Sequence, residues 1–168
     1  MALFEPIFEA LNRTGARYVV VGGVAVVLQG YTRLTVDLDL VVDLEPVAAG
    51  KTVSALSALG LRPRAPVDPM GFADPIVRRE WIEQKGLQVF SFLDPNNPLL
   101  AVDLFVEPPL PFEELWARSR EVSLGEIVVR VASVPDLLAL KRRAGRPQDL
   151  ADIAALEVLE RERRERER

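Results

Sequence analysis

Residues 18–43, YVVVGGVAVVLQGYTRLTVDLDLVVD, contain the pattern that decides the fold. A short apolar run leads to Gly22 and Gly23, a helix-length apolar segment follows, and a second β-branched run carries Asp37 and Asp39. Residues two apart on a strand point to the same face, so the two carboxylates project together and their apolar neighbours project away. The stretch therefore predicts a strand, a glycine turn, a helix and an acidic strand in succession.

The aspartate pair indicates a cation site. Two like charges on one face of an apolar strand repel each other and resist desolvation, and a cation between them relieves both effects. Carboxylate oxygens suit Mg²⁺, which usually keeps further positions for water and substrate phosphate. The alternative for Asp37 and Asp39 is an edge strand with one face in water.

The glycine pair supplies the second half of the predicted site. Glycine at a strand-to-helix turn permits a positive φ and lets a ligand approach the backbone closely. The N–H groups that begin the next helix carry partial positive charge, where a phosphate can bind. A phosphate cradle beside a metal-binding carboxylate pair is typical of phosphoryl or nucleotidyl transfer.

The pattern of Gly-Gly, thirteen residues and Asp-Leu-Asp resembles the signature of the polymerase-beta-type nucleotidyltransferase superfamily. That superfamily has a third carboxylate on a later strand, and Asp103 within Ala-Val-Asp-Leu-Phe fits it, the alternative being an ordinary strand-face aspartate. The resemblance implies an α/β (α+β) fold, with a mixed β-sheet flanked by helices and with C-terminal helices. It also implies two Mg²⁺ ions, with Mn²⁺ as an alternative, held by the catalytic residues Asp37, Asp39 and Asp103.

The run SVPDLLALKRRAGRPQDLADIAAL, residues 133–156, resembles the C-terminal segment of the AbiEii-like nucleotidyltransferases, several of which are toxins of toxin–antitoxin pairs. Lys141 matches a helix lysine of that group, and residues 146–152 match its R-x-K-D-x-x-D segment, with Gln148 in place of lysine. The front segment matches R-x-T/S-x-D-x-D. The resemblance implies nucleotide binding by Gly22, Gly23, Arg33, Thr35, Lys141, Arg146 and Asp149.

The cations of this segment also have physical roles without the resemblance. Lys141 and Arg146 can neutralise triphosphate oxygens, since a leaving pyrophosphate accumulates charge. The alternative for Lys141 is a favourable position near a helix C-terminus, and Asp149 and Asp152 are equally favourable in the first turn of the next helix.

These observations predict an NTP-dependent nucleotidyltransferase that moves a nucleoside monophosphate to a hydroxyl acceptor. The acceptor classes left open are tRNA, a protein and a small molecule, and the resemblance adds a cognate antitoxin as a partner. The chain has no histidine, so metal activation of the hydroxyl is more plausible than side-chain base catalysis. The alternative is a catalytically inactive nucleotide-binding or protein-interaction module.

Length and composition are typical of a globular protein, with 168 residues of which 49% are apolar and 27% charged. We expect a nucleotidyltransferase core over 1–133 and a C-terminal helical segment over 134–168 packed on it as one compact unit. The absence of cysteine excludes disulfides. No apolar run reaches the roughly 20 residues of a membrane span, and the N-terminus lacks a signal peptide's basic start, so a cytoplasmic protein with no membrane partner is expected.

The net charge of −4 argues against broad nucleic-acid binding, although arginines near 62–79 and 141–146 could form a local groove. Periodicity and turn residues predict the remaining elements. We expect a proline-rich loop over 61–80 and an exposed, fraying helix over the tail 161–168. The other expected elements are helices over 2–14, 24–30, 46–59, 112–118, 133–144 and from 147, strands over 18–21, 34–43, 87–93 and 100–106, and a hairpin over 121–132.

Overall fold

A computed structural model describes residues 1–166 of the chain. The helices are α1 (Glu5–Arg13), α2 (Gly22–Leu28), α3 (Pro46–Ala58), the 3-10 helix η1 (Pro69–Ala73), α4 (Pro75–Lys85), α5 (Phe112–Arg118), α6 (Val134–Ala144) and α7 (Pro147–Arg166). The strands are β1 (Tyr18–Val21), β2 (Asp37–Val42), β3 (Arg62–Pro63), β4 (Val89–Asp94), β5 (Asn97–Phe105), β6 (Arg120–Leu124) and β7 (Ile127–Val131).

The strands form one mixed seven-stranded sheet, which confirms the predicted fold class. Their order across the sheet is β3-β4-β5-β2-β1-β7-β6. The central pairs matter most for the site, because β2 runs antiparallel to β1 and parallel to β5. These central strands are the ones that the apolar runs of the sequence predicted, and all four residues of β1 are buried.

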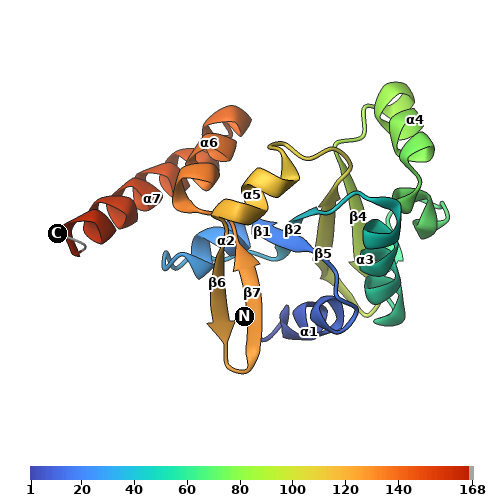
Figure 1. Cartoon of the computed structure of the whole chain (residues 1–168), viewed down its shortest axis with the longest axis horizontal. Helices are drawn as coiled ribbons and strands as arrows, with labels where there is room; N and C mark the ends of the chain where they lie inside the picture. Colours follow the sequence, from blue (N-terminus) through green and yellow to red (C-terminus); the bar gives the residue numbers. More distant parts are fainter. Residues whose placement is uncertain (167–168) are drawn as a thin grey trace.

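Helices pack around the sheet (Figure 1). The helices α1 and α3 lie side by side against the sheet, and α2 leads directly out of β1. The helices α6 and α7 pack together at one end of the molecule, with α4 towards the other end. The single apolar core that results includes fully buried aromatic and aliphatic side chains from helices and strands alike, such as Phe8, Leu38, Phe92, Leu104 and Leu156.

The helix α4 corrects the expectation of a loop over 61–80. Four prolines suggested breaks in any long element, yet Pro75 occupies the first turn of α4, where its missing N–H costs nothing. Asp74 caps the helix by accepting hydrogen bonds from the backbone N–H groups of Ile76 and Val77. Arg78, assigned to a basic groove, is instead buried and donates hydrogen bonds to the carbonyls of Phe72 and Leu44.

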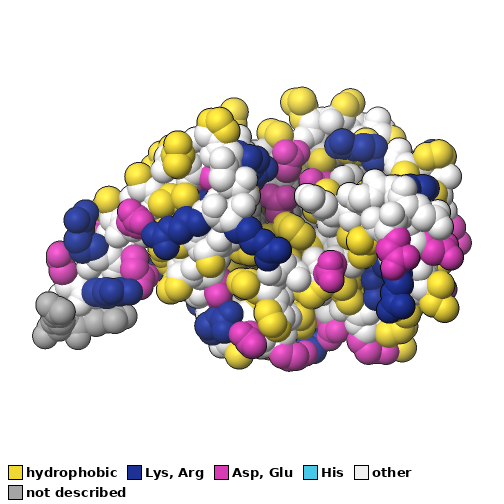
Figure 2. All heavy atoms as spheres, turned by 90° about the horizontal axis from the view of Figure 1, so that it is seen from above, with side chains coloured by type: hydrophobic (Ala, Val, Ile, Leu, Met, Phe, Trp, Pro, Cys, Tyr) yellow, Lys and Arg dark blue, Asp and Glu magenta, His cyan; other side chains and the backbone are white. Residues whose placement is uncertain are grey.

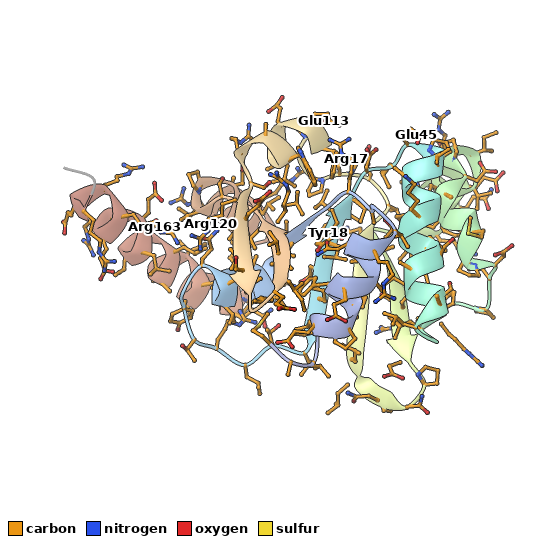
Figure 3. The ribbon with its side chains drawn as sticks, turned by 60° about the horizontal axis from the view of Figure 1, so that its bottom comes forward. Arg17, Tyr18, Glu45, Glu113, Arg120 and Arg163 are labelled. Atoms are coloured by element: carbon orange, nitrogen blue, oxygen red, sulfur yellow. The ribbon has the colours of Figure 1, made fainter. Side chains whose placement is uncertain are left out.

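The C-terminal tail is partly attached to the body, which also differs from the prediction. Arg163 of α7 donates hydrogen bonds to the backbone oxygen and to Oε1 of Gln29, at 3.1 and 2.8 Å. Figure 3 shows Arg163 and Arg120 close together on the underside of the molecule. Nearer the start of α7, Leu150 is 69% exposed, whereas Leu156 is fully buried in the core. Residues 167–168 of the predicted tail lie outside the described residues.

None of the helices in the described part of the chain combines the length and the apolar character that crossing a membrane requires.

Candidate active site

The centre of the site is a pair of aspartates on neighbouring strands. The parallel pairing of β2 with β5 places Asp39 directly opposite Asp103, and Asp37 opposite Ala101. Asp39 and Asp103 are partly buried, whereas Asp37 is exposed at the start of β2. The structure therefore brings two of the three predicted carboxylates, Asp39 and Asp103, together. It places the third, Asp37, two residues before Asp39 at the exposed start of β2.

Gly22 holds the glycine turn against this acidic pair. The turn follows β1, whose residue Val21 pairs with Asp39. Gly22 has a φ of +65°, and a Cβ atom at this position would lie 2.0 Å from Oδ2 of Asp39. Only glycine therefore allows both the backbone conformation and the close approach of the carboxylate.

Burial and like charge raise the pKa of Asp39 to about 7. The largest cause is the loss of water around its carboxyl group, followed by the negative charges of Asp103 and Asp37. Arg146 and Lys141 oppose this rise through their positive charges. A carboxylate under such strain gains from a cation that binds to it directly.

The hydrogen bonding of Asp103 also favours a bound cation. Its Oδ1 atom is buried and has no hydrogen-bond partner in the structure. A buried acceptor without a partner is costly, and in functional sites such an atom often marks the place of a ligand or ion. Within residues 1–166, no three acidic side chains already stand close enough to form a complete metal site, so a bound cation would draw on water and substrate oxygens as well.

A second set of charged residues lies between α6, α7 and the segment before β2. Lys141 is buried, and its Nζ atom lies 3.2 Å from Oδ1 of Asp149 and 2.6 Å from Oδ2 of Asp152. Arg146 bonds to Asp149 through Nε at 3.0 Å and through its backbone N–H, and Arg33 pairs with Asp152. We call these five residues the cationic network, because three cations against two carboxylates leave one net positive charge.

The pKa of Asp149 illustrates how complete this pairing is. Burial on its own would raise that pKa, but the hydrogen bonds from Arg146 and Lys141 outweigh burial and lower it. The hydrogen bond to Asp149 in turn raises the pKa of Arg146. Asp149 and Arg146 thus stabilise each other's charged forms.

Arg33 and Thr35 connect this network to the glycine turn. A Cβ atom on Gly23 would lie 2.7 Å from Oγ1 of Thr35 and 3.1 Å from Nη2 of Arg33. Arg33 therefore lies between the start of α2 and Asp152 of α7. The sequence-predicted nucleotide-binding residues form one continuous neighbourhood in the fold.

A cleft of about 980 Å³ joins the acidic pair to the network. Gly22, Asp39, Asp103, Lys141 and Arg146 all line it. Figure 2 shows acidic side chains set in a hollow of the surface with Lys and Arg side chains beside it. A metal-binding acidic centre next to fixed positive charge is an arrangement that can bind and cleave a charged phosphoanhydride.

Two features of the cleft were missed by sequence reasoning. Asp152 was recognised as part of a motif but not as the partner that joins Lys141 to Arg33, because the fold of α6 onto α7 is needed to see it. The wall opposite α6 is built by the end of α4 and by the segment after β5, which includes Glu107. The prolines before and at the start of α4 predicted a loop, so the sequence did not indicate this wall of the cleft.

Comparison with known proteins identifies the family. The family model described as "Nucleotidyl transferase AbiEii toxin, Type IV TA system" matches residues 8–165. No curated protein matches the sequence.

Several solved structures share the fold. The lincosamide antibiotic adenylyltransferase LnuA, bound to lincomycin, is 15% identical, with 95% of this chain and 97% of that chain covered and a TM-score of 0.63. ANT(2'')-Ia in complex with adenylyl-2''-tobramycin is 16% identical, with 99% and 98% covered and a TM-score of 0.60. A putative nucleotidyltransferase from Thermotoga maritima is 14% identical, with 91% and 89% covered and a TM-score of 0.58.

At these identities the solved structures establish the fold, while the family match spans nearly the whole chain. The chain belongs to the AbiEii nucleotidyltransferase family.

Proposed function

We propose that this protein uses Mg²⁺ to transfer a nucleoside monophosphate from an NTP, such as ATP, to a hydroxyl acceptor. The observation that carries the proposal is the register of β2 and β5, which sets Asp39 beside Asp103 in a cleft that Lys141 and Arg146 also line. As an NTP-dependent enzyme it would work in the cytoplasm, where its substrate is present.

The donor set fits Mg²⁺. The unpaired Oδ1 atom of Asp103 and the raised pKa of Asp39 both favour a hard cation with oxygen ligands. Asp37, exposed on the same row, would complete the set of carboxylates. When bound, the metal would neutralise phosphate charge and lower the pKa of the acceptor hydroxyl.

The chain's own residues would orient the reactants. Gly22 and Gly23 present the backbone at the start of α2 to the phosphates, and Lys141 and Arg146 offset the charge of the departing pyrophosphate. The acceptor oxygen forms a bond to the α-phosphorus as the bond to the pyrophosphate oxygen breaks. With Oδ1 of Asp103 given to the cation, the other carboxylate oxygen of Asp103 would accept the hydroxyl proton.

The remaining network residues would act by position. Asp149 and Asp152 are buried and hold Lys141, while Arg33 ties Asp152 to the glycine turn. Asp149 would therefore support nucleotide binding through Lys141 and Arg146 and not through direct contact. Thr35, packed at the same turn, would keep the loop before β2 close to the phosphates.

The acceptor and the biological setting are further parts of the proposal. The family description names a toxin of a toxin–antitoxin system, which supports a toxin role here with a cognate antitoxin as partner. Two structures of similar fold belong to enzymes that modify antibiotics, one of them in complex with adenylyl-2''-tobramycin. Both macromolecular and small acceptors are therefore compatible with membership of this fold.

The test incubates the purified protein with Mg²⁺, each α-³²P-labelled NTP, total tRNA, and the antibiotics lincomycin and tobramycin. Wild type is compared with Asp103→Asn and with Glu126→Gln, an exposed carboxylate in the β6–β7 turn that serves as the matched control. We expect transfer of label by wild type and the control, and none by Asp103→Asn. Nucleotide binding without transfer to any acceptor would instead support an inactive module.

A further inference from the structure

The two walls of the cleft differ in charge. Every cationic side chain that lines it comes from α6 or from the segment that joins α6 to α7, namely Lys141, Arg143 and Arg146. This wall lies beside the glycine turn and would face the triphosphate. Lys141 and Arg146 act on Asp39 through their charge and would serve the triphosphate, whereas Arg143 donates a hydrogen bond to the carbonyl of Pro109 across the cleft.

The opposite wall has no lysine or arginine among its lining residues. It is formed by the end of α4, the start of β4 and residues 105–109, and Glu107 is its only charged side chain. The C-terminal end of α4, capped by Gly86, also lies here, and helix C-termini carry partial negative charge. Lys85 in the last turn of α4 is exposed and does not line the cleft.

An acceptor bound at Asp103 would lie against this second wall. Asp103 is the carboxylate on its side, because β5 continues from Asp103 through Phe105 into the segment that carries Glu107. Phe105 and the nearby Leu87 and Pro108 add apolar surface. An acceptor whose hydroxyl meets Asp103 would thus lie on apolar side chains next to negative charge.

The cleft is also limited in size. Its volume of about 980 Å³ is at the upper end of small-molecule pockets, which run to about 1,000 Å³, and a nucleotide would take a share of it. At one point the walls touch, since Arg143 donates a hydrogen bond to the carbonyl of Pro109 at 3.1 Å. An RNA end would need a basic track for its phosphates, yet Arg142 is paired with Glu157 and Arg78 is buried.

We infer that the acceptor is a small hydroxyl compound that is neutral or bears ammonium groups, and that it binds between Asp103 and Glu107. This inference rests on the proposed nucleotidyl transfer and specifies the class of its second substrate. RNA and anionic metabolites are disfavoured by the negative wall.

The first experiment offers the enzyme a fractionated cell extract with Mg²⁺ and α-³²P-labelled ATP and GTP. Ultrafiltration separates RNA and protein from small molecules, and ion exchange divides the small molecules into cationic, neutral and anionic fractions. We expect label to pass to a compound in the cationic or neutral fraction. Label on RNA, on protein or only in the anionic fraction would overturn the inference and leave nucleotidyl transfer standing, whereas no transfer to any fraction would count against nucleotidyl transfer itself.

The second experiment changes the charge of the acceptor wall with the labelled fraction as substrate. Glu107→Lys should reduce kcat/KM for a cationic acceptor roughly tenfold or more, a change typical of one lost charge pair, and should leave the KM for the NTP unchanged. The kcat/KM of Glu107→Gln for the cationic acceptor should lie between those of wild type and Glu107→Lys. Glu126→Lys, the same charge change on an exposed turn, should behave as wild type.

For a neutral acceptor, the same variants would change kcat/KM little, and a tenfold gain of transfer to tRNA in Glu107→Lys would be expected from the lost repulsion. Equal transfer to RNA by wild type and Glu107→Lys would show that this wall does not select the acceptor.

Discussion

Two pairs of aspartates in this protein differ in whether neighbouring cations pair with them. Asp149 and Asp152, one turn apart on α7, are buried but matched by Lys141, Arg146 and Arg33. Asp39 and Asp103 lie side by side on β2 and β5. Asp39 is influenced by the charges of Lys141 and Arg146 only through space, and Oδ1 of Asp103 has no hydrogen-bond partner. The first pair is neutralised within the protein, and we propose that the second keeps its unmet charge for a bound cation.

We propose that the source of the countercharge distinguishes structural from functional carboxylates in this protein. Burial alone does not distinguish them, because Asp149 and Asp152 are the more deeply buried pair. The distinguishing property is whether the protein itself supplies the countercharge. Where the protein supplies the countercharge, replacing the lysine or arginine should destabilise the fold. Where the protein does not supply it, replacing the carboxylate should reduce activity alone.

The largest effect is expected on activity from Asp39→Asn. The change removes a proposed metal ligand, and such ligands stabilise a transition state by several kcal/mol, so transfer should fall by roughly 10³-fold or more. Stability in the absence of metal should stay level or rise, because a repulsion is relieved. Transfer assays and thermal melts in EDTA check both parts, and an unfolded variant would place Asp39 among the structural carboxylates.

The converse change is Lys141→Met. It leaves Asp149 and Asp152 buried without their shared cation, which should destabilise the fold by about 3–5 kcal/mol. Urea denaturation measures this loss, with Arg142→Met as the matched control because Arg142 pairs with Glu157 on the exposed surface. A loss under about 1 kcal/mol, the range of surface pairs, would mean that the network is not structural.

The pH dependence of stability sharpens the contrast. The pKa of Asp39 in the folded protein, about 7, lies above its ordinary value of 3.8, so the folded state binds this proton more tightly than the unfolded state. This contribution is complete below the unfolded pKa and is lost as pH rises from about 4 to 7, on the order of a few kcal/mol. Urea denaturation in EDTA across this range should show the fall in wild type and a smaller one in Asp39→Asn. Parallel curves for the two proteins would contradict the assigned pKa.

The smallest effect concerns the tail. The hydrogen bonds from Arg163 to Gln29 predict a loss of about 1 kcal/mol for Arg163→Ala. Arg164→Ala, which breaks only an i,i+4 pair with Glu160, should cost less than about 0.5 kcal/mol. Equal values for the two variants would restore the sequence-based expectation of a loosely held tail.

Much of the fold could be predicted because local pattern and tertiary environment agree. The apolar runs around Gly22 and Asp39 specified a central strand, a turn and an acidic strand, and those elements are present. The helix α4 was missed because proline in a first helical turn and proline in a loop look alike without the cap made by Asp74.

The site could be predicted only in part for a different reason. The spacing of residues showed which carboxylates share a strand face, but the distances that pair Lys141 with Asp152, or Asp39 with Asp103, depend on tertiary packing. The resemblance implied nucleotide binding by Asp149, and only the fold shows that its carboxylate pairs with Lys141 and Arg146. Partnership between charges appears only once the helices and strands are assembled.

The parallel pairing of β2 with β5 also affects how the enzyme folds. Asp39 and Asp103 are separated along the chain by α3, α4 and β4, and such long-range pairing forms slowly compared with local structure. The cleft is also lined by Lys141 and Arg146, which follow both aspartates in the sequence. A nascent chain that has not yet extended past Arg146 therefore lacks a complete cleft.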